Sequence, residues 1–462
     1  MKKRLNRRIM KKWLGMLLAG VTVSSALCAC VSEKTPVSTT QESGTQNSGA
    51  QASGKEEHVT LRFLSYASEY EEAEKVVLDA YHAKNPNVTV NIEYITDKSK
   101  DYLTKTDVML MGGEPIDIIM TPSPKDYSVR AESNSYLPLD SFFEAEGTNI
   151  EDEFNVVYKV NDQVYGIPAE MKYAIVFINK DMLDEAGLPV PPLDWTWDDY
   201  REYAVKMTKG EGADKIYGSY FHTFSDMVLY GVSSAKKGSK IFNEDGSLTF
   251  NNPEFAKFMQ FRYELENEDK ASVPLADMKA LNMNYTDQFF NGKTAMLPMM
   301  TYMLNLMVNE KYEHNFETTF ARIPLWEKED EHYTPVAATL FCIAKTTEHP
   351  QEAFDFLKFW CTEGVEIKGM TIANQKGVDK FECAERMVGD GAEHVDMEAL
   401  NAVLNDEKWV DSYEEYIPVY QSEIESILME ESDKYLLGSQ SLEDMVNNLM
   451  KRGNAVIAEN QK

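Results

Sequence analysis

Between residues 59 and 120, stretches typical of β-strands alternate with stretches typical of α-helices. Residues 59–65 and 88–94 are rich in β-branched side chains in an alternating pattern. Residues 69–82 and 102–111 repeat their apolar residues at helical spacing. Residues 116–120 are almost entirely apolar, as expected for a strand buried on both faces of a parallel sheet. This order of elements restricts the region to an α/β fold.

Two loops of this region are candidate ligand-binding positions. Ligands of α/β sheets bind beyond the carboxyl ends of the strands. Tyr66 follows the first predicted strand, and Ser123 follows the third. We therefore expect both residues to take part in binding, with a purely structural role in their loops as the alternative.

The rest of the chain is long enough for a second domain. About 400 residues follow position 56, more than one hydrophobic core usually serves. The pattern predicts a strand over 174–178 and a helix over 197–208, which begins after Thr196, a residue type that caps helices. From about residue 412 to the end, the chain is predicted to be helical throughout.

The N-terminus has the signature of an exported lipoprotein. Seven Lys and Arg residues precede an apolar stretch that hydroxyl residues interrupt, which is typical of a signal peptide and not of a membrane span. Leu27 and Ala29 stand three and one positions before Cys30, a spacing that resembles the lipobox of bacterial lipoproteins. We expect residues 1–29 to be a signal peptide and Cys30 to carry lipid chains, which bind membranes through their methylenes.

Residues 30–56 are predicted to be the lipidated cysteine and a flexible linker. Ser, Thr, Gln, Gly and Ala dominate this segment, and such a composition buries too little apolar surface to fold. The folded body is then expected at the extracellular face of the cytoplasmic membrane, held there through the lipid anchor only. An ordinary cleaved signal with an incidental cysteine is the alternative.

The charge of the chain excludes some partners. The net charge is −30, and removal of residues 1–29 takes away seven basic and no acidic residues, which makes it −37. Such a surface repels nucleic acid, anionic lipid and polyanionic ligands. The acidity otherwise indicates a solubilising surface, and we expect a monomer.

The cysteines do not indicate a disulfide scaffold or a metal site. Apart from the N-terminal pair there are Cys342, Cys361 and Cys383, an odd number without metal-type spacing. We expect buried free thiols that act as small apolar residues, with one disulfide among the three as the alternative. We predict neither a metal nor a cofactor.

Five segments in order along the chain resemble the bacterial extracellular solute-binding proteins of family 1, the sugar-binding components of ABC importers. They are YGIPAE at 165–170, FINKDMLDEAG at 177–187, WTWDDY at 195–200, GKTAM at 292–296 and HPQEAFDF at 349–356. The resemblance implies a two-lobed fold of the type II periplasmic-binding-protein kind. Each lobe is then a mixed sheet flanked by helices, and a hinge of crossing segments joins the lobes.

The resemblance also implies the division of the chain and its function. One lobe is expected to take residues 57–168 and 340–385, and the other residues 169–339 and 386–462. A sugar or oligosaccharide would be captured in the cleft between the lobes, where ligands commonly bind, and delivered to the permease subunits of an ABC transporter. Catalytic residues are not expected.

The resemblance suggests further binding residues. Glu170 matches an acid that lies in the cleft of family members, although a solvated loop acid is the alternative. The other candidates are aromatic or imidazole side chains near family ligand positions, namely His222, Phe224, Tyr302, Trp409 and Tyr413. The loop of His222 lacks the family's acid, Tyr302 replaces the usual Gly-Trp, and core packing is the alternative for Trp409 and Tyr413.

Other functions remain open at this point. A secreted carbohydrate-active hydrolase would use paired carboxylates, but the body contains no G-x-S-x-G, H-E-x-x-H or phosphate-loop motif. The same fold could bind a polyamine, which suits the acidity, or a glycerol-phosphate-type anion, for which Lys172 is the one strand-end cation that we identify. The protein could also present its ligand to a sensor kinase.

Overall fold

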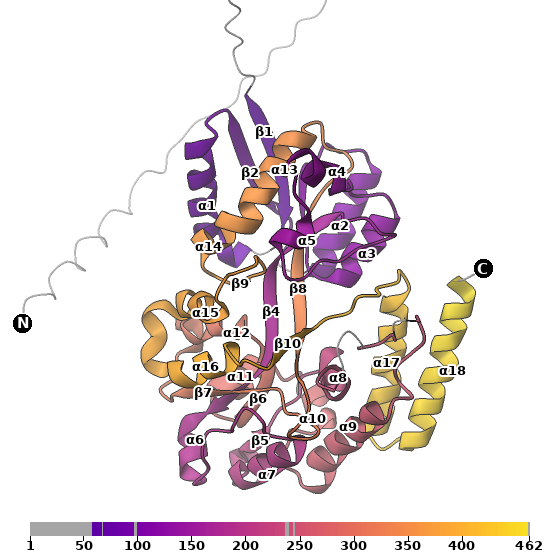
Figure 1. The fold of residues 1–462 in the computed structure, drawn as a ribbon. Helices are drawn as coiled ribbons and strands as arrows, with labels where there is room; N and C mark the ends of the chain where they lie inside the picture. The colour runs from indigo at the N-terminus through magenta and orange to yellow at the C-terminus, as the bar shows by residue number, and fades with distance from the viewer. Residues whose placement is uncertain (1–57, 67, 97–98, 236–239, 244, 461–462) are drawn as a thin grey trace, which may run out of the picture. The chain divides into compact units, whose positions relative to one another are not determined.

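The computed structural model describes residues 58–460, apart from residues 67, 97–98, 236–239 and 244 (Figure 1). The contacts divide the chain after Lys55, and the body Glu56–Lys462 is described by itself. The predicted signal peptide, the lipidation site Cys30 and the linker lie outside the described residues.

The first sheet has the strand order β2-β1-β3-β8-β4 and is mixed. Strands β2 (Val88–Tyr94), β1 (Val59–Ser65) and β3 (Ile118–Thr121) run parallel to one another. Strands β8 (His332–Ile343) and β4 (Gly166–Asn179) continue the sheet in antiparallel pairs. The α/β alternation predicted for residues 59–120 is therefore confirmed.

Helices flank this sheet, as the apolar spacing predicted. Helix α13 (Pro350–Phe359) contacts β1 and β8, and its continuation brings the Trp360 ring to 5.1 Å from the Phe63 ring (Figure 1). The remaining helices of this region are α1 (Glu71–Lys84), α2 (Ser99–Met111), α3 (Pro124–Glu132), α4 (Asp140–Ala145), α5 (Ile150–Glu153) and α14 (Val365–Lys368).

Strand β4 belongs to both sheets of the body. Its first half pairs with β8 and, over two residues, with β9 (Ile372–Ala373), whereas residues 174–179 pair with β6 (Thr294–Met300) on one side and β7 (Thr318–Arg322) on the other. The sequence predicted only a strand over 174–178. The strand is longer because pairing to β8, which is distant in sequence, orders residues 166–173 as well.

The second sheet is also mixed and carries its own helices. Strand β5 (Tyr217–Ser219) runs parallel to β6 and packs against α7 (Trp197–Met207). Thr196 and Asp199 form a capping box at the start of α7, which confirms the predicted helix start. The other helices of this region are α6 (Lys180–Glu185), α8 (Asp226–Ser233), α9 (Pro253–Tyr263), α10 (Leu275–Ala280), α11 (Tyr285–Phe290) and α12 (Met303–Met307).

The C-terminal region corrects one prediction. It contains α15 (Lys380–Val388), α16 (Met397–Leu404), β10 (Trp409–Ser412), α17 (Gln421–Leu436) and α18 (Leu442–Asn460). Residues 413–420 are not helical, so the prediction of helix from residue 412 onward is wrong there. The chain first pairs β10 with β8, and the Ile417 carbonyl then accepts a hydrogen bond from Ser128 of α3.

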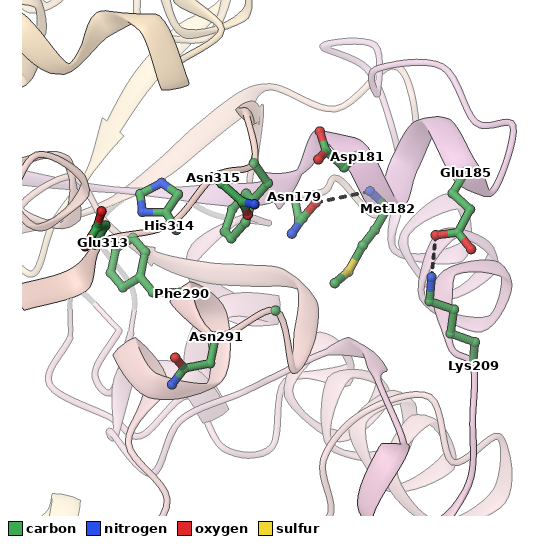
Figure 2. A pocket seen from close by; sticks show the side chains of 12 residues that line it. Asn179, Asp181, Met182, Glu185, Lys209, Phe290, Asn291, Glu313, His314 and Asn315 are labelled. Carbon is green, nitrogen blue, oxygen red and sulfur yellow. Dashed lines mark hydrogen bonds and ion pairs between the residues drawn. The ribbon is translucent and has the colours of Figure 1, made fainter.

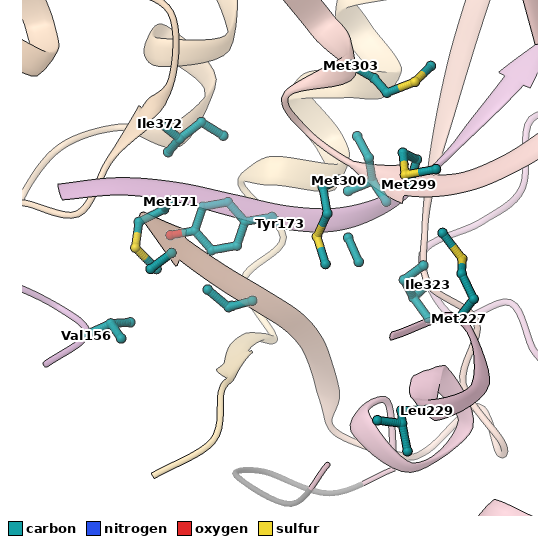
Figure 3. Packing of buried hydrophobic residues seen from close by; sticks show 14 of the residues in the cluster. Val156, Met171, Tyr173, Met227, Leu229, Met299, Met300, Met303, Ile323 and Ile372 are labelled. Carbon is teal, nitrogen blue, oxygen red and sulfur yellow. The ribbon is translucent and has the colours of Figure 1, made fainter. Parts of the chain in front are cut away.

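Methionines make up much of the core near the crossing. Met171 of β4 and Met299 and Met300 at the end of β6 lie in one buried cluster with Tyr173 (Figure 3). Because methionine is unbranched and polarizable, it fills irregular gaps between packed elements. The two sheets are thus joined by an adaptable apolar core.

Cys342, Cys361 and Cys383 are buried free thiols. The expectation that these cysteines act as buried apolar residues is confirmed, and the alternative of a disulfide among the three is wrong. Across residues 58–460, as far as they are described, no helix combines the length and the apolar character that crossing a bilayer requires.

Gly218 of β5 allows close contact with α7, and we predict that Gly218→Ala destabilises the protein. An added Cβ would lie 1.8 Å from the Ala204 carbonyl oxygen, so the strand and the helix must separate. We expect a loss of about 3 kcal/mol in the free energy of unfolding, measured by urea denaturation. Gly112→Ala is the control, since its Cβ would stay 3.3 Å from the nearest atoms. Equal losses in the two variants would contradict the argument.

Candidate functional site

Glu170 lies on the crossing strand in a buried ion-pair cluster. A bulge between Pro168 and Glu170 shifts the pairing register, and Glu170 is 5% exposed. Lys368, which ends α14, places its Nζ 2.5 Å from Glu170 Oε1 and 3.4 Å from Glu74 Oε1 of α1. These three side chains, the Glu74–Lys368–Glu170 triad, connect α1, β4 and α14.

The triad holds its charges by mutual neutralisation. Burial disfavours a charge on Lys368, but the carboxylates of Glu170 and Glu74 outweigh it and raise the pKa of Lys368. Burial also raises the pKa of Glu74, against the opposing effects of Lys368 and of a 2.6 Å hydrogen bond from the Tyr94 hydroxyl. Lys368 is therefore the cation on which both buried acids depend.

Tyr66 and Tyr70 lie beside the triad. The Lys368 Nζ is 4.9 Å from the centre of the Tyr70 ring, a cation–π contact. Burial and then the charge of Glu170 raise the pKa of Tyr66, and they raise the pKa of Tyr70 to about 12. Both rings remain partly exposed. The structure thus brings the predicted residues Tyr66 and Glu170 together.

Ser123 has a local role that the sequence also allowed. It caps α3: its Oγ accepts a 3.4 Å hydrogen bond from the Asp126 backbone N–H and donates a 2.5 Å bond to the Asp126 carboxylate. The charge of Asp126 contributes to the raised pKa of Tyr66, so the start of α3 faces the same region.

A second group of rings comes from the other sheet. The Tyr302 hydroxyl donates a 3.0 Å hydrogen bond to the Tyr285 hydroxyl, and the His222 ring lies 5.1 Å from the Tyr285 ring and 4.5 Å from that of Phe224. Burial and then Tyr285 raise the pKa of Tyr302, and Tyr70 contributes as well. The predicted residues Tyr302, His222 and Phe224 therefore form one ring cluster, which lies close to the rings of the first sheet.

Trp409 and Tyr413 lie on the opposite side of β4. Alternate residues of a strand face opposite sides, and Trp409 packs 5.4 Å from Tyr173, whose neighbour Lys172 shares the face of Glu170. The Tyr413 ring contacts the Tyr158 ring at 5.7 Å. The structure therefore separates this pair from the other six predicted residues.

The sequence analysis did not identify several residues as members of the binding site. They are Tyr70, Tyr285 and Lys368, whereas Lys172 was named only as a cation for an anionic ligand. Tyr70 ends a short 3-10 helix, Ser68–Tyr70, in the same connection between β1 and α1 as Tyr66, so its position was a usable signal. Lys368 becomes visible only when α14 is packed against α1.

Two surface depressions lie elsewhere in the second region. One of about 510 Å³ is lined by Asn179, Phe290, Asn291, His314 and their neighbours (Figure 2). An adjoining one of about 770 Å³ shares Glu313 and His314. Asn179 ends β4, nine residues from Glu170, or about 30 Å along an extended strand. Neither depression includes any predicted site residue.

Comparisons with known proteins give a consistent result. The family model described as bacterial extracellular solute-binding protein matches residues 65–367. An arabinooligosaccharide-binding protein of Halalkalibacterium halodurans is 24% identical over 225 residues, which are 48% of this chain and 47% of that protein. The matched stretch is thus about half the length of that relative.

Solved structures match over more of the chain. A sugar transporter of Rhizobium etli in an open conformation has a TM-score of 0.70 and 23% identity, covering 85% of this chain and 98% of its own. An ABC substrate-binding protein of Listeria monocytogenes in complex with cycloalternan has a TM-score of 0.71 and 20% identity, covering 87% and 100%. The predicted two-lobed type II fold is therefore confirmed.

We predict that Lys368→Met strongly destabilises the protein. The substitution leaves Glu170 and Glu74 buried without their cation, which typically costs about 3–5 kcal/mol. Lys75→Met on the same region's surface is the control, because the Lys75–Asp79 pair is exposed and such pairs contribute about 0.5 kcal/mol. Urea denaturation measures both variants. Equal midpoints would show that the triad contributes no stability.

We also predict an acid-dependent loss of stability from His222. Burial lowers its pKa from 6.5 to about 4. Between these values the unfolded chain binds more protons than the folded one, so the free energy of unfolding falls as the pH falls from 6.5 to 4. Because the ring is partly exposed, we expect about 1–2 kcal/mol. His222→Asn should remove this part of the pH dependence in urea titrations, and an unchanged slope would contradict the assignment.

Proposed function

Because the chain belongs to the bacterial extracellular solute-binding proteins, we propose that it captures a sugar or oligosaccharide between its two lobes for an ABC importer. The observation that carries this proposal is the convergence of partly exposed rings from both sheets near the triad face of β4. Tyr66 and Tyr70 come from the first region, and Tyr285 and Tyr302 from the second. We propose residues 57–168 and 340–385 as one lobe and the remainder of the body as the other.

The chemistry of the rings suits a carbohydrate. A sugar presents apolar ring faces and many hydroxyl groups. Aromatic side chains cover the ring faces, and the phenol and imidazole groups of Tyr66, Tyr302 and His222 supply polar edges. Binding sites of this type combine aromatic walls with a few placed polar groups.

The charges at the crossing favour an uncharged ligand. Lys368 and Lys172 balance Glu74 and Glu170, so the face of β4 carries no excess charge. Two further charged groups near Tyr66, Asp126 and Glu69, are acids whose charges help to raise the pKa of Tyr66. An anion such as a glycerol phosphate would meet these acids, whereas a polyamine would lack an unpaired acid at the triad.

Capture would proceed by closure of the lobes about the crossing. Hinge closure is a common response of two-lobed binding proteins. A ligand shifts the open–closed equilibrium only through its higher affinity for the closed form, which rings on both lobes provide. We further propose that the loaded form is delivered to permease subunits and that Cys30 lipidation holds the protein at the extracellular face of the membrane. The proposed role involves no bond cleavage.

The relatives support an oligosaccharide. The protein of Halalkalibacterium halodurans is named for arabinooligosaccharide binding, and a multiple sugar-binding protein of Streptococcus mutans is 23% identical over 67% of this chain and 72% of its own. Several aromatic rings along the proposed site fit a ligand of more than one sugar unit.

A ligand screen tests the proposal. Neutral oligosaccharides, spermidine and glycerol phosphate are each added to the full chain, and the melting temperature is followed. A true ligand at about 100 times its dissociation constant adds about 2.7 kcal/mol of stability. We expect an oligosaccharide to raise the melting temperature and small-angle scattering to show compaction. If spermidine alone stabilised the protein, the ligand would be a polyamine and the sugar proposal would be wrong. Release of shorter sugars from an oligosaccharide would indicate a hydrolase.

We predict that Tyr302→Ala weakens sugar binding by about 10- to 100-fold, since it removes a ring face and the hydroxyl bond to Tyr285. Calorimetric titration measures the affinity. Tyr263→Ala is the control, because this ring packs 5.2 Å from Tyr435 of α17, away from the crossing. Equal affinities in the two variants would remove Tyr302 from the site.

A further inference from the structure

Lys172 belongs to the proposed binding face of β4. It stands two residues after Glu170, so the two side chains emerge from the same side of β4. Pairing of β4 with β8 ends one residue later, at Tyr173, and from Ala174 onward β4 pairs with β6 and β7. Thr301, the neighbour of Tyr302, is fixed to Tyr173 by two hydrogen bonds of 2.9 and 3.2 Å. Lys172 is thereby held next to the Tyr302 segment.

The Glu170 carboxylate is already paired with another side chain of the protein. It is 5% exposed, and its carboxylate is paired with Lys368 at 2.5 Å. A ligand hydroxyl that replaced this contact would leave Lys368 with Glu74 alone, at 3.4 Å. Breaking a buried ion pair costs several kcal/mol. Glu170 therefore acts through the triad and is poorly placed to receive a ligand.

Lys172 has the opposite character. Lys172 is half-buried, and burial is the main cause that lowers its pKa. Its ammonium group donates one 2.7 Å hydrogen bond, to Thr339 Oγ1 of β8. An ammonium has three N–H donors, and no ion pair to Lys172 occurs among the described residues.

An ammonium in such a position needs oxygen acceptors. A ligand that takes water's place at such a group must supply the hydrogen bonds that water would make. Hydroxyl and ring oxygens of a sugar meet this need without adding a charge. The positive charges of Lys172 and Lys368 already balance the negative charges of Glu74 and Glu170. A neutral oxygen acceptor on the ligand therefore fits better than a carboxylate.

We propose that Lys172 is the residue of the crossing strand that binds the ligand, by donating hydrogen bonds to hydroxyl or ring oxygens of a neutral oligosaccharide, while Glu170 holds the triad in place. This inference rests on the proposed function. It assigns ligand recognition to Lys172 and a positioning role to Glu170.

The test uses the full chain, with maltotriose and arabinotriose as probes in calorimetric titration. Lys172→Met is expected to weaken binding of the neutral trisaccharide by about 10- to 100-fold, as the loss of a charge-assisted hydrogen bond does. Lys172→Arg should restore most of the affinity, because it keeps a cationic donor. Lys206→Met is the matched control, since Lys206 makes an exposed pair with Glu202 on α7.

A pH profile separates recognition from a structural role. Lys172 faces Glu170 of its own strand, Lys368 of α14 and Thr339 of β8. Because its pKa is lowered, wild-type affinity should fall as the pH rises toward 10, while Lys172→Arg keeps its affinity. This comparison decides the proposal even if Lys172→Met does not fold.

Three results would count against the proposal in different ways. Wild-type affinity in Lys172→Met would overturn the assignment of Lys172. A matching alkaline decline in Lys172→Arg would do the same. If the wild-type chain binds neither trisaccharide nor any other neutral oligosaccharide, the proposed function fails instead.

Discussion

The hydrogen bonding of β4 is divided between two sheets, and the rest of the body depends on this division. Its first half is paired to β8 and its second half to β6 and β7, so residues 166–179 cannot slide without breaking pairs in both sheets. A one-residue slip would also exchange the two faces of the strand. The triad and Lys172 thus stay on one side, and Met171 and Tyr173 stay on the other, in the apolar core.

One lysine, Lys368, allows two acids to be buried at this crossing. Glu74 and Glu170 would be costly in a low-dielectric interior without Lys368, and the same cation ties α1 and α14 to the strand. The result is a neutral polar face surrounded by rings. Such a face suits the recognition of hydroxyl groups, because it offers donors and acceptors without a net charge that would select ions.

The opposite side of β4 has a different function. There Tyr173 packs against Trp409, and methionines fill the space between the sheets (Figure 3). Methionine side chains change rotamer at low cost. The crossing therefore combines a backbone paired on both sides with an adaptable apolar core.

The sequence by itself determined the elements whose signals are local. The strand over 59–65 and the helix after Thr196 were predicted correctly, because alternation, helical spacing and capping act between near neighbours. The same holds for the family, whose motifs are short segments. The continuous strand β4 and the non-helical residues 413–420 were not predicted, because pairing with β8 and contact with α3 decide them.

For the site, the strand-end position pointed to Tyr66 and the family resemblance pointed to Glu170, and the structure places these two residues near each other; their roles in binding stay predictions. Neither signal showed that Lys368 covers Glu170 or that Trp409 faces away from it. Both contacts depend on which side of β4 faces which distant element. A charged or aromatic side chain therefore acquires its partner only when the chain is folded. The tertiary structure alone decided that Glu170 is paired with Lys368, whereas Lys172 makes no ion pair among the described residues and donates a hydrogen bond to Thr339.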